Sequence, residues 1–355
     1  MAKIQSLSAY PILDSRGQTT VEVNLSLDDG SSSVASVPSG TSTGKYEAKT
    51  VGTDVAIYEI KEKISRKLTN IDIPSQETLD LILKDNEYGA NSRLAVSIAF
   101  AKAKNTLPLS QRKCLPKLMM LIFEGGKHAH NDLLIQEYLL IVDTINEGAQ
   151  IYQEIGKRLE TEGLGSDVGL EGGFAPRKMK DIEALIKLKN IIGNKANLGL
   201  DVAASQDLGN MKWDYDKIFN DFPVTSLEDP FPEDNETDWL NLMQKYGKEK
   251  MIIGDDLTAT NPERTKMAIE KKLCNGIIIK PNQIGTVSET LNVVAMAKKM
   301  GLKIVVSHRS GETNDTFIAD LAVSVDADFV KFGAPVRGER VAKYNRLLEI
   351  EKRWK

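Results

Sequence analysis

The sequence predicts an α/β fold, namely an irregular eight-stranded α/β barrel of the TIM type that carries a smaller N-terminal α+β domain. Three observations predict it. Apolar and polar side chains alternate over residues 3–37, which is typical of a half-buried antiparallel sheet. Six short apolar runs follow in the second half of the chain, and each ends at one chemically capable polar residue. The intervals between these residues are 27, 27, 25, 28 and 23, enough for one strand, one loop and one helix each time.

The N-terminal domain is predicted to occupy residues 1–112. TTVEVNLSLDDG is typical of a strand that ends in a turn, and SSSVASV of the strand that pairs with it. A loop of small residues at 39–44 follows, and then helical patterns at 54–68, 76–84 and 91–104. The polar segment NTLPLSQRK leads into the second domain, for which we predict residues 113–355.

The second domain is predicted to be the barrel. Two early apolar runs at 117–123 and 135–142 and the six later ones make eight strands. Apolar runs with little alternation are typical of strands buried on both faces. The connection between the two early strands is short, which predicts an irregular start. In such barrels the active site lies at the carboxyl ends of the strands, where the six polar residues stand.

Three of these polar residues are carboxylates on successive strand ends: Asp201, Glu228 and Asp255. Together they predict a site for a hard divalent cation such as Mg²⁺, which prefers oxygen ligands. The alternative for any one of them is a cap on the next helix. Asp229 and Asp256 stand beside two of them and offer second carboxylates, so the ligand set stays open at this point.

The other three strand ends carry cationic or titratable groups. Lys280 near a metal has reason to lose its proton and act as a base, or it pairs with a carboxylate. Lys331 permits the same two interpretations, or an electrostatic role toward an anion. His308 opens the sequence HRSGE, in which Arg309 and Ser310 suit a phosphate or a carboxylate.

Three further residues are weaker candidates. His128 and His130 have a spacing that suits a transition metal, although a solvated histidine is the commoner case. Glu137 stands on the second early strand. Glu171 precedes GGFAP, and a carboxyl group in a glycine-rich turn can approach a ligand closely or be purely structural.

Composition narrows the partners and the compartment. The net charge of −4 and the isoelectric point of about 5.7 give no reason to expect nucleic acid or an acidic membrane surface. The two cysteines are far apart and have no CxxC spacing, so we expect reduced thiols in a cytoplasmic protein. We expect no signal peptide in MAKIQSLSAYPILDSRG, and no apolar run approaches the ~20 residues of a membrane span.

The chain resembles the enolase family from end to end. The resemblance rests on LDSRGQTTVEV, VPSGTSTGKYEA, GLEGGFAP, LDVAASQ, SLEDPF, GDDLTATNP, IIIKPNQIGTVSET, VSHRSGETNDTFIADLAV and KFGAPVRGERVAKYNRLLEIE. It is densest from Gly199 onward. It implies a small N-terminal domain on an irregular eight-stranded barrel, as the periodicity predicts.

The resemblance also implies the metal ligands and the base. Asp201, Glu228 and Asp255 correspond to the ligands of the tighter of two Mg²⁺ ions. Ser42, in the loop 39–44 that is mobile in the family, corresponds to the ligand that closes over the second Mg²⁺. Lys280 corresponds to the base that takes the C2 proton of 2-phosphoglycerate. A lysine base with Mg²⁺ ions that stabilise the enediolate is the known arrangement of this superfamily.

The remaining roles follow from the same resemblance. Glu171 corresponds to the acid that helps the C3 hydroxyl group leave, with Glu137 beside it. Lys331 would face the substrate carboxylate, and Arg309 and Ser310 would hold the phosphate. His308 and His128 would line the pocket.

The implied function is the Mg²⁺-dependent reversible dehydration of 2-phospho-D-glycerate to phosphoenolpyruvate by a cytoplasmic homodimer or higher homo-oligomer. The alternatives are a divergent lyase of the superfamily that acts on another carboxylate, and a non-catalytic binding protein. The chain departs from the family's pattern at Leu170, where the motif has Asp, and at Leu121 and Glu124, which replace asparagines. The N-terminal domain also looks shortened.

Overall fold

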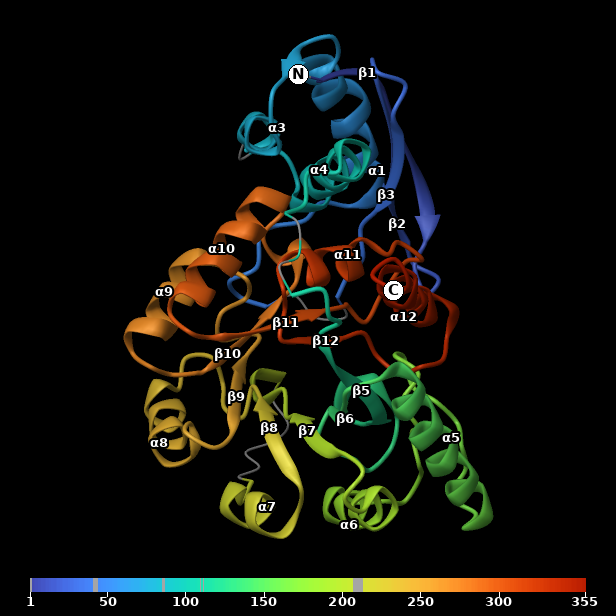
Figure 1. Cartoon of the computed structure of the whole chain (residues 1–355), viewed down its shortest axis with the longest axis vertical. Coiled ribbons are helices and arrows are strands. Elements are labelled where there is room, and N and C mark those ends of the chain that lie inside the picture. The colour runs from blue at the N-terminus through green and yellow to red at the C-terminus, as the bar shows by residue number, and fades with distance from the viewer. Residues whose placement is uncertain (1, 41–43, 85–86, 109, 111, 207–212) are drawn as a thin grey trace.

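The computed structural model describes residues 2–40, 44–84, 87–108, 110, 112–206 and 213–355. Figure 1 shows two parts along the long axis, with the N-terminal sheet and its helices at one end and the barrel at the other. The last helix, α12, lies on the barrel beside the N-terminal part. The predicted fold class is confirmed. The boundary near residue 112 falls between helix α4 and strand β5 and stays a prediction.

The N-terminal part is an antiparallel sheet covered by helices. In the described residues its strands have the order β3-β2-β1-β4. The strands are β1 (Ala2–Leu13), β2 (Thr19–Leu27), β3 (Ser32–Ser36) and β4 (Asp72–Ile73). The helices are α1 (Thr53–Tyr58), α2 (Ser65–Leu68), α3 (Gln76–Leu83) and α4 (Ala90–Lys104). A π-helical turn, Glu59–Ile64, joins α1 to α2, so the pattern at 54–68 forms one continuous helical segment.

The barrel closes as the sequence predicts. Among the described residues, eight strands form a closed ring in the order β10-β11-β12-β5-β6-β7-β8-β9. The strands are β5 (Lys117–Glu124), β6 (Glu137–Val142), β7 (Asn197–Asp201), β8 (Val224–Glu228), β9 (Met251–Gly254), β10 (Gly276–Ile279), β11 (Lys303–Ser307) and β12 (Phe329–Lys331). All six polar residues of the periodic series therefore end a strand or directly follow one.

The irregularity of the barrel lies in strand β6. This strand runs antiparallel to both of its neighbours, β5 and β7, whereas the other neighbouring strands are parallel. Glu137, the first residue of β6, therefore pairs with Glu124 at the end of β5 and with Asp201 at the end of β7. The reversal is what brings a residue from the start of a strand to the carboxyl end of the barrel.

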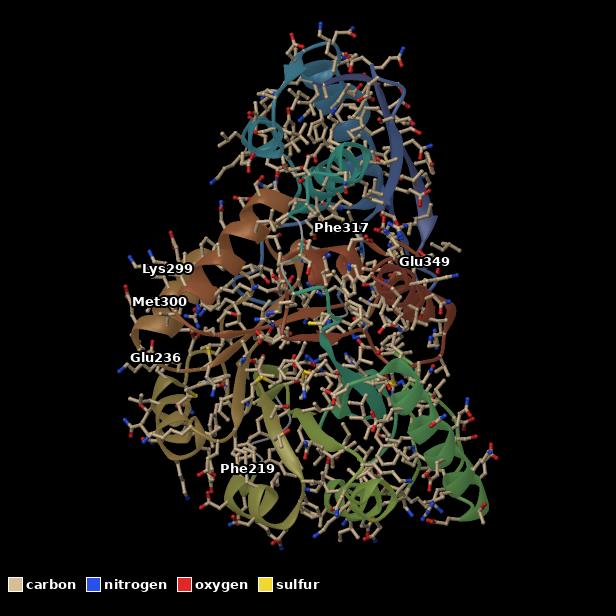
Figure 2. All side chains as sticks on the ribbon, in the orientation of Figure 1. Phe219, Glu236, Lys299, Met300, Phe317 and Glu349 are labelled. Carbon is tan, nitrogen blue, oxygen red and sulfur yellow. The ribbon has the colours of Figure 1, made fainter. Side chains whose placement is uncertain are left out.

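Helices cover the outside of the ring (Figure 1). They are α5 (Ile145–Thr161), α6 (Asp181–Ile192), α7 (Tyr215–Asp221), α8 (Glu236–Tyr246), α9 (Pro262–Glu270), α10 (Val287–Lys299), α11 (Phe317–Ser324) and α12 (Gly338–Lys352). In Figure 2, Lys299, Met300 and Glu349 lie toward the outside, and Met300 is 58% exposed. Phe317 is buried and lies between the barrel and the N-terminal part.

The residues that cap these helices show whether the carboxylates at the strand ends act as helix caps, an alternative that the sequence left open. The α-helices that follow β7, β8 and β9 begin after Asp214, Asn235 and Asn261, whose side chains accept hydrogen bonds from backbone N–H groups two or three residues ahead. The carboxylates at the ends of these strands are therefore not the caps of the helices that follow. They remain available for chemistry inside the barrel.

The N-terminal part rests on the carboxyl end of the barrel. Ser39 and Gly311 exchange two backbone hydrogen bonds of 2.8 and 2.9 Å. The backbone N–H of Ala48 donates to the carbonyl oxygen of Gln283 at 2.8 Å, and that of Ser15 to Glu312 at 2.7 Å. Residues on either side of the predicted loop at 39–44 are therefore held by the barrel loops that follow β10 and β11.

Two smaller expectations agree with the structure. Cys114 is exposed and Cys274 is buried, and both are free thiols. None of the helices in the described residues is long and apolar enough to cross a membrane.

Candidate active site

One narrow cavity at the carboxyl end of the barrel collects most of the predicted residues. Its lining includes ten predicted site residues: His128, Glu137, Glu171, Asp201, Asp255, Lys280, His308, Arg309, Ser310 and Lys331. Glu228 does not line it, because it is fully buried beneath the ammonium group of Lys331. Ser42 lies outside the described residues, although Gly40 on the near side of its loop borders the cavity.

Lys331 stands among three carboxylates. Its Nζ lies 2.9 Å from Asp201 Oδ2, 2.8 Å from both carboxylate oxygens of Glu228 and 3.1 Å from Glu137 Oε2. Burial alone would lower the pKa of Lys331, but the charges of Asp201, Glu137 and Glu228 outweigh it and hold the pKa well above its ordinary value. Lys331 is therefore a fixed positive charge in the floor of the cavity.

Lys280 is paired in the same way with Asp255. Its Nζ contacts Asp255 Oδ2, and Gln283 Nε2 donates to Asp255 Oδ1 at 3.1 Å. Burial favours neutral Lys280, but the carboxylate of Asp255 outweighs it and raises the pKa of the lysine. In this state Lys280 carries a proton, so its use as a base requires that the charge of Asp255 be taken up by another cation.

The carboxylates here have the chemistry of a site for a hard cation. Asp229 accepts backbone hydrogen bonds from Asp255 (2.9 Å) and Asp256 (2.7 Å), which fixes the turn after β9. Carboxylate oxygens of these three residues lie within 4.8 Å of one another. Burial, with Asp255 close by, raises the pKa of Asp256 to about 7. So many buried acidic groups need positive charge, and lysine ammonium groups supply part of it here.

The predicted ligand set stays a prediction. Asp201 and Glu228 are joined through Lys331, while Asp255 is joined to Lys280. The structure thus brings the three predicted ligands to one end of the barrel. It also brings Asp229 and Asp256 there, the second carboxylates that the sequence left open.

Glu171 and His308 form a second kind of pair. His308 Nε2 lies 2.9 Å from Glu171 Oε2, and Arg340 Nη1 lies 2.8 Å from His308 Nδ1. Because a guanidinium group can only donate, we assign Nδ1 as the acceptor and Nε2 as the nitrogen that carries hydrogen. Burial, assisted by Arg340 and opposed by Glu171, lowers the pKa of His308 to about 3. The histidine is therefore neutral, and its Nε2 lies beside the carboxylate of Glu171.

Glu171 itself is ionised in this state. Burial raises its pKa, but the donor from His308, the neighbouring His128 and the charge of Arg340 outweigh burial and hold the pKa below its ordinary value. His128 Nδ1 lies 3.7 Å from Glu171 Oε1 and 3.8 Å from Glu137 Oε1. An acid role for Glu171 therefore needs a proton from elsewhere.

Arg309 is held in place by groups that the sequence did not single out. Its Nη1 and Nη2 donate to the two carboxylate oxygens of Glu47 at 3.0 and 3.1 Å, and Nη1 also donates to Asn282 Oδ1 at 3.1 Å. The backbone N–H of Gly44 donates to Glu47 Oε1 at 3.0 Å. Glu47 thus links the predicted anion-binding arginine to the end of the loop at 39–44. Its place just after that glycine-rich loop was the only signal in the sequence.

Arg340 is a second residue that the sequence analysis missed. Its side chain is fully buried, and it donates to the carbonyl oxygens of Arg309 (2.6 Å) and Ser310 (2.8 Å) as well as to His308. It therefore fixes the backbone of the HRS segment. The motif RGERVAK, which contains this arginine, does not indicate the role from the sequence alone.

This fold and this cavity define an α/β-barrel enzyme that applies acid–base chemistry to a small anionic substrate. Residues 4–109 match the family model for "Enolase, N-terminal domain", and residues 112–217 and 208–354 match that for "Enolase, C-terminal TIM barrel domain". The chain belongs to the enolase family, and the predicted enzyme class, a lyase, is confirmed.

Curated relatives agree along nearly the whole chain. The chain is similar to enolases of Beutenbergia cavernae (37% identical, covering 99% of this chain and 95% of that protein) and Elusimicrobium minutum (38% identical, covering 99% and 96%). A third relative, the enolase of Bdellovibrio bacteriovorus, is 38% identical with the same coverage as the second. These alignments run over 406 positions, more than the 355 residues of this chain. The relatives therefore contain segments that this chain lacks.

Proposed function

We propose that this chain catalyses the Mg²⁺-dependent, reversible dehydration of 2-phospho-D-glycerate to phosphoenolpyruvate. The observation that carries the proposal is the placement of Lys280 and Glu171. Lys280 follows β10, whereas Glu171 lies beside β5, to which its segment is joined by a bridge between Phe123 and Phe174. Strands β11 and β12 separate them in the ring, yet both side chains line one cavity. A base and an acid can therefore reach neighbouring carbon atoms of one substrate.

The side chains divide the reaction between them. Lys280 takes the proton from C2, which leaves negative charge on the neighbouring carboxylate group. Lys331, already a fixed positive charge, stabilises that charge where it develops. Glu171, once protonated, gives its proton to the departing C3 hydroxyl group, with Glu137 and His128 beside it. Arg309 and Ser310 hold the phosphate, and His308 orients Glu171.

We propose Asp201, Glu228 and Asp255 as ligands of the tighter Mg²⁺ and Ser42 as a ligand of a second Mg²⁺. Bound Mg²⁺ would supply positive charge that acidifies the C2 proton. The buried carboxylates support the assignment, because oxygen ligands on successive strand ends suit this ion. Lys280 loses the cause of its raised pKa when the charge of Asp255 is neutralised by a partner other than the lysine.

A direct assay tests the function. The purified chain is mixed with Mg²⁺ and 2-phosphoglycerate, and the ultraviolet absorbance of the enol phosphate is followed. We expect turnover that stops when a chelator removes the metal and returns when Mg²⁺ is added back. A folded, metal-binding protein without turnover on this substrate would contradict the proposal. It would favour the divergent lyase or the binding protein instead.

We also propose that the chain is cytoplasmic and forms a homodimer or higher homo-oligomer. The reduced cysteines support the first statement and the family resemblance supports the second. The acidic isoelectric point supports the expectation of no nucleic-acid partner. Light scattering coupled to size-exclusion chromatography measures the oligomeric state, and a mass of 39.2 kDa in solution would contradict the oligomer.

A further inference from the structure

Glu124 lies directly behind the proposed acid. It is the last residue of β5, it is fully buried, and it pairs across the strands with Glu137. Its Oε1 accepts a hydrogen bond from the backbone N–H of Glu171 at 2.6 Å. The carboxyl group of Glu124 therefore fixes the backbone of Glu171.

Two glycines make room for this carboxyl group. A Cβ atom on Gly169 would lie 1.7 Å from Glu124 Oε2, and a Cβ atom on Gly173 would lie 2.7 Å from Glu124 Cγ. Real Cβ atoms do not approach other atoms so closely. The glycine-rich turn around Glu171 is thus shaped around the side chain of Glu124. The turn therefore has a structural role as well as the catalytic role predicted for Glu171.

The second oxygen of Glu124 lies against Gly169. Glu124 Oε2 is buried and makes no hydrogen bond within the part of the chain that the structure describes. One ligand atom each of Glu124, His128 and Glu171 lie within 4.8 Å of one another. The titratable or charged groups that face Glu124 are Glu171, Glu137, His128, Arg340 and Tyr152.

The charges around Glu124 and Glu171 indicate which of the two carboxyl groups carries a proton. Burial raises the pKa of Glu124 well above its ordinary value, and the charge of Glu171 adds to the effect. Two buried carboxylates in one cluster repel each other, so one of them retains a proton. His308 Nε2 lies 2.9 Å from Glu171 Oε2 and the positive charge of Arg340 favours ionised Glu171, whereas the charge of Glu171 itself disfavours an ionised Glu124. The proton therefore resides on Glu124.

We propose that Glu124 is a positioning residue that stores the proton which Glu171 delivers to the departing C3 hydroxyl group. The inference rests on the proposed function and deepens it. It explains how a carboxyl group that is ionised in the unliganded protein becomes an acid. Glu124 has no contact with substrate in this account and acts only through Glu171.

The proton balance closes over one turnover. The Glu124 O–H bond breaks and a Glu171 O–H bond forms, through rotation of a carboxyl group or through one water molecule. The Glu171 O–H bond then breaks as the hydroxide departs from C3 as water. The C2 proton is on Lys280 at this point, and Glu124 is a carboxylate. Loss of the lysine proton to solvent and uptake of one proton by Glu124 restore the starting state.

Glu124→Gln is the variant that tests the proposal. The amide oxygen keeps the acceptor for the N–H of Glu171 but cannot release a proton. We expect kcat for dehydration to fall about 100-fold with KM within about threefold, since acid–base groups contribute at least this much. Exchange of the C2 hydrogen with solvent deuterium, followed by NMR, should continue within about twofold because it needs only Lys280. Glu171→Gln should give the same pattern.

The matched control is Glu59→Gln. Glu59 is also a buried glutamate, and its Oε2 accepts from the N–H of Gly89 (2.9 Å) and from Ser92 (2.6 Å), but it lies in the N-terminal part. We expect this control to keep the wild-type ratio of dehydration to exchange. An unchanged kcat in Glu124→Gln would overturn the proposal. So would an equal fall of dehydration and exchange, which would indicate a structural role alone.

An infrared spectrum separates this inference from the proposed function. At pH 7 we expect the difference spectrum of wild type minus Glu124→Gln to contain the C=O stretch of one protonated carboxylic acid. Other buried carboxyl groups, such as Glu137, whose pKa burial raises to about 8, are present in both proteins and cancel in the difference. The measurement needs no turnover, so it holds even if 2-phosphoglycerate is not the substrate. Absence of the band from the difference spectrum would overturn the proposal. A metal ion bound stoichiometrically in the wild type and lost in Glu124→Gln would overturn it as well.

Discussion

The two sides of the cavity neutralise their buried acidic groups in different ways. On the base side, Asp201, Glu228 and Asp255 meet lysine ammonium groups within hydrogen-bonding distance. On the acid side, Glu124 and Glu171 meet neutral histidines and backbone N–H groups. The partners of these three carboxylates on the base side are charged ammonium groups, whereas the nearest partners on the acid side are neutral donors. We infer that different events must prepare the two sides for catalysis.

The base side becomes ready for catalysis when another cation replaces Lys280 as the partner of Asp255. Lys280 becomes a base when it no longer neutralises Asp255, so a second positive charge is needed near that carboxylate. Preparation of the acid side consists of a proton transfer to Glu171. The geometry of the barrel agrees with this division. The base side comes from the parallel strands β7 to β10, and the acid side lies where β5 meets the reversed strand β6.

The largest expected effect is on the base side and comes from Lys280→Ala. We expect both dehydration and exchange of the C2 hydrogen to fall by roughly 10⁴-fold, because both steps use Lys280 as the proposed base. Metal binding, measured by calorimetry, should remain largely unchanged. The pattern differs from that of Glu171→Gln, in which exchange survives. Turnover at the wild-type rate in Lys280→Ala would show that the base is assigned wrongly.

Lys331→Met should destabilise the protein by about 3–5 kcal/mol in the presence of a chelator. The substitution leaves Asp201, Glu228 and Glu137 buried without their shared cation. Denaturant unfolding measures the loss, and added Mg²⁺ should recover part of it by supplying positive charge at the same carboxylates.

A matched control for this variant is Lys343→Met. Lys343 is also buried, but its Nζ pairs with the single carboxylate of Glu312 at 2.8 Å, away from the base side. We expect it to be destabilised as well, without recovery by Mg²⁺. Equal recovery in both variants would mean that Mg²⁺ does not bind at the carboxylates around Lys331.

Gly169→Ala should perturb the acid side by a smaller amount. Its Cβ would collide with Glu124 Oε2, so the carboxyl group must move, at a cost of about 1–3 kcal/mol in unfolding free energy. Gly52→Ala is the control, because a Cβ atom there meets nothing within 4 Å. We expect only Gly169→Ala to lower the ratio of dehydration to C2 exchange. A wild-type ratio in that variant would mean that Glu171 does not depend on the place of Glu124.

The base side was predictable from sequence and the acid side only in part. Each of the six polar residues at the strand ends, from Asp201 to Lys331, follows an apolar run, and the parallel order of those strands brings their ends together. The direction of β6 cannot be read from its apolar run, because a buried strand has the same composition in either direction. Only the structure therefore explains why Glu137, at the start of a strand, joins the site.

Contacts between residues far apart in the chain could not be predicted from the sequence, for a different reason. Glu47 and Arg309 are 262 positions apart, and Glu124 and Glu171 are 47 apart. Neither pair follows a strand or helix period, so no pattern along the chain indicates it. The departures at Glu124 and Leu170 were visible only against the family pattern. The structure gives Glu124 a hydrogen bond to Glu171, while Leu170 is half-buried and its N–H donates to His128 at 3.2 Å.

The smallest expected effect is a change in how stability depends on pH. Burial lowers the pKa of His308 to about 3, whereas an unfolded histidine titrates near 6.5. Between these values the unfolded chain binds a proton that the folded protein does not, so the free energy of unfolding falls as pH falls below about 6.5. We expect His308→Gln to reduce this slope by up to about 1.4 kcal/mol per pH unit between about pH 6.5 and 5.

Urea unfolding of the metal-free proteins at a series of pH values measures the slope. His128, whose pKa burial also lowers, contributes the same slope to both proteins, so their difference isolates His308. Buried carboxyl groups with raised pKa values, such as Asp256 at about 7, are present in both proteins, so their contribution to the slope cancels in the difference. Equal slopes would mean that His308 is protonated in the folded protein. Glu171 would then be neutralised by charge, as the carboxylates of the base side are, and the contrast between the two sides would not hold.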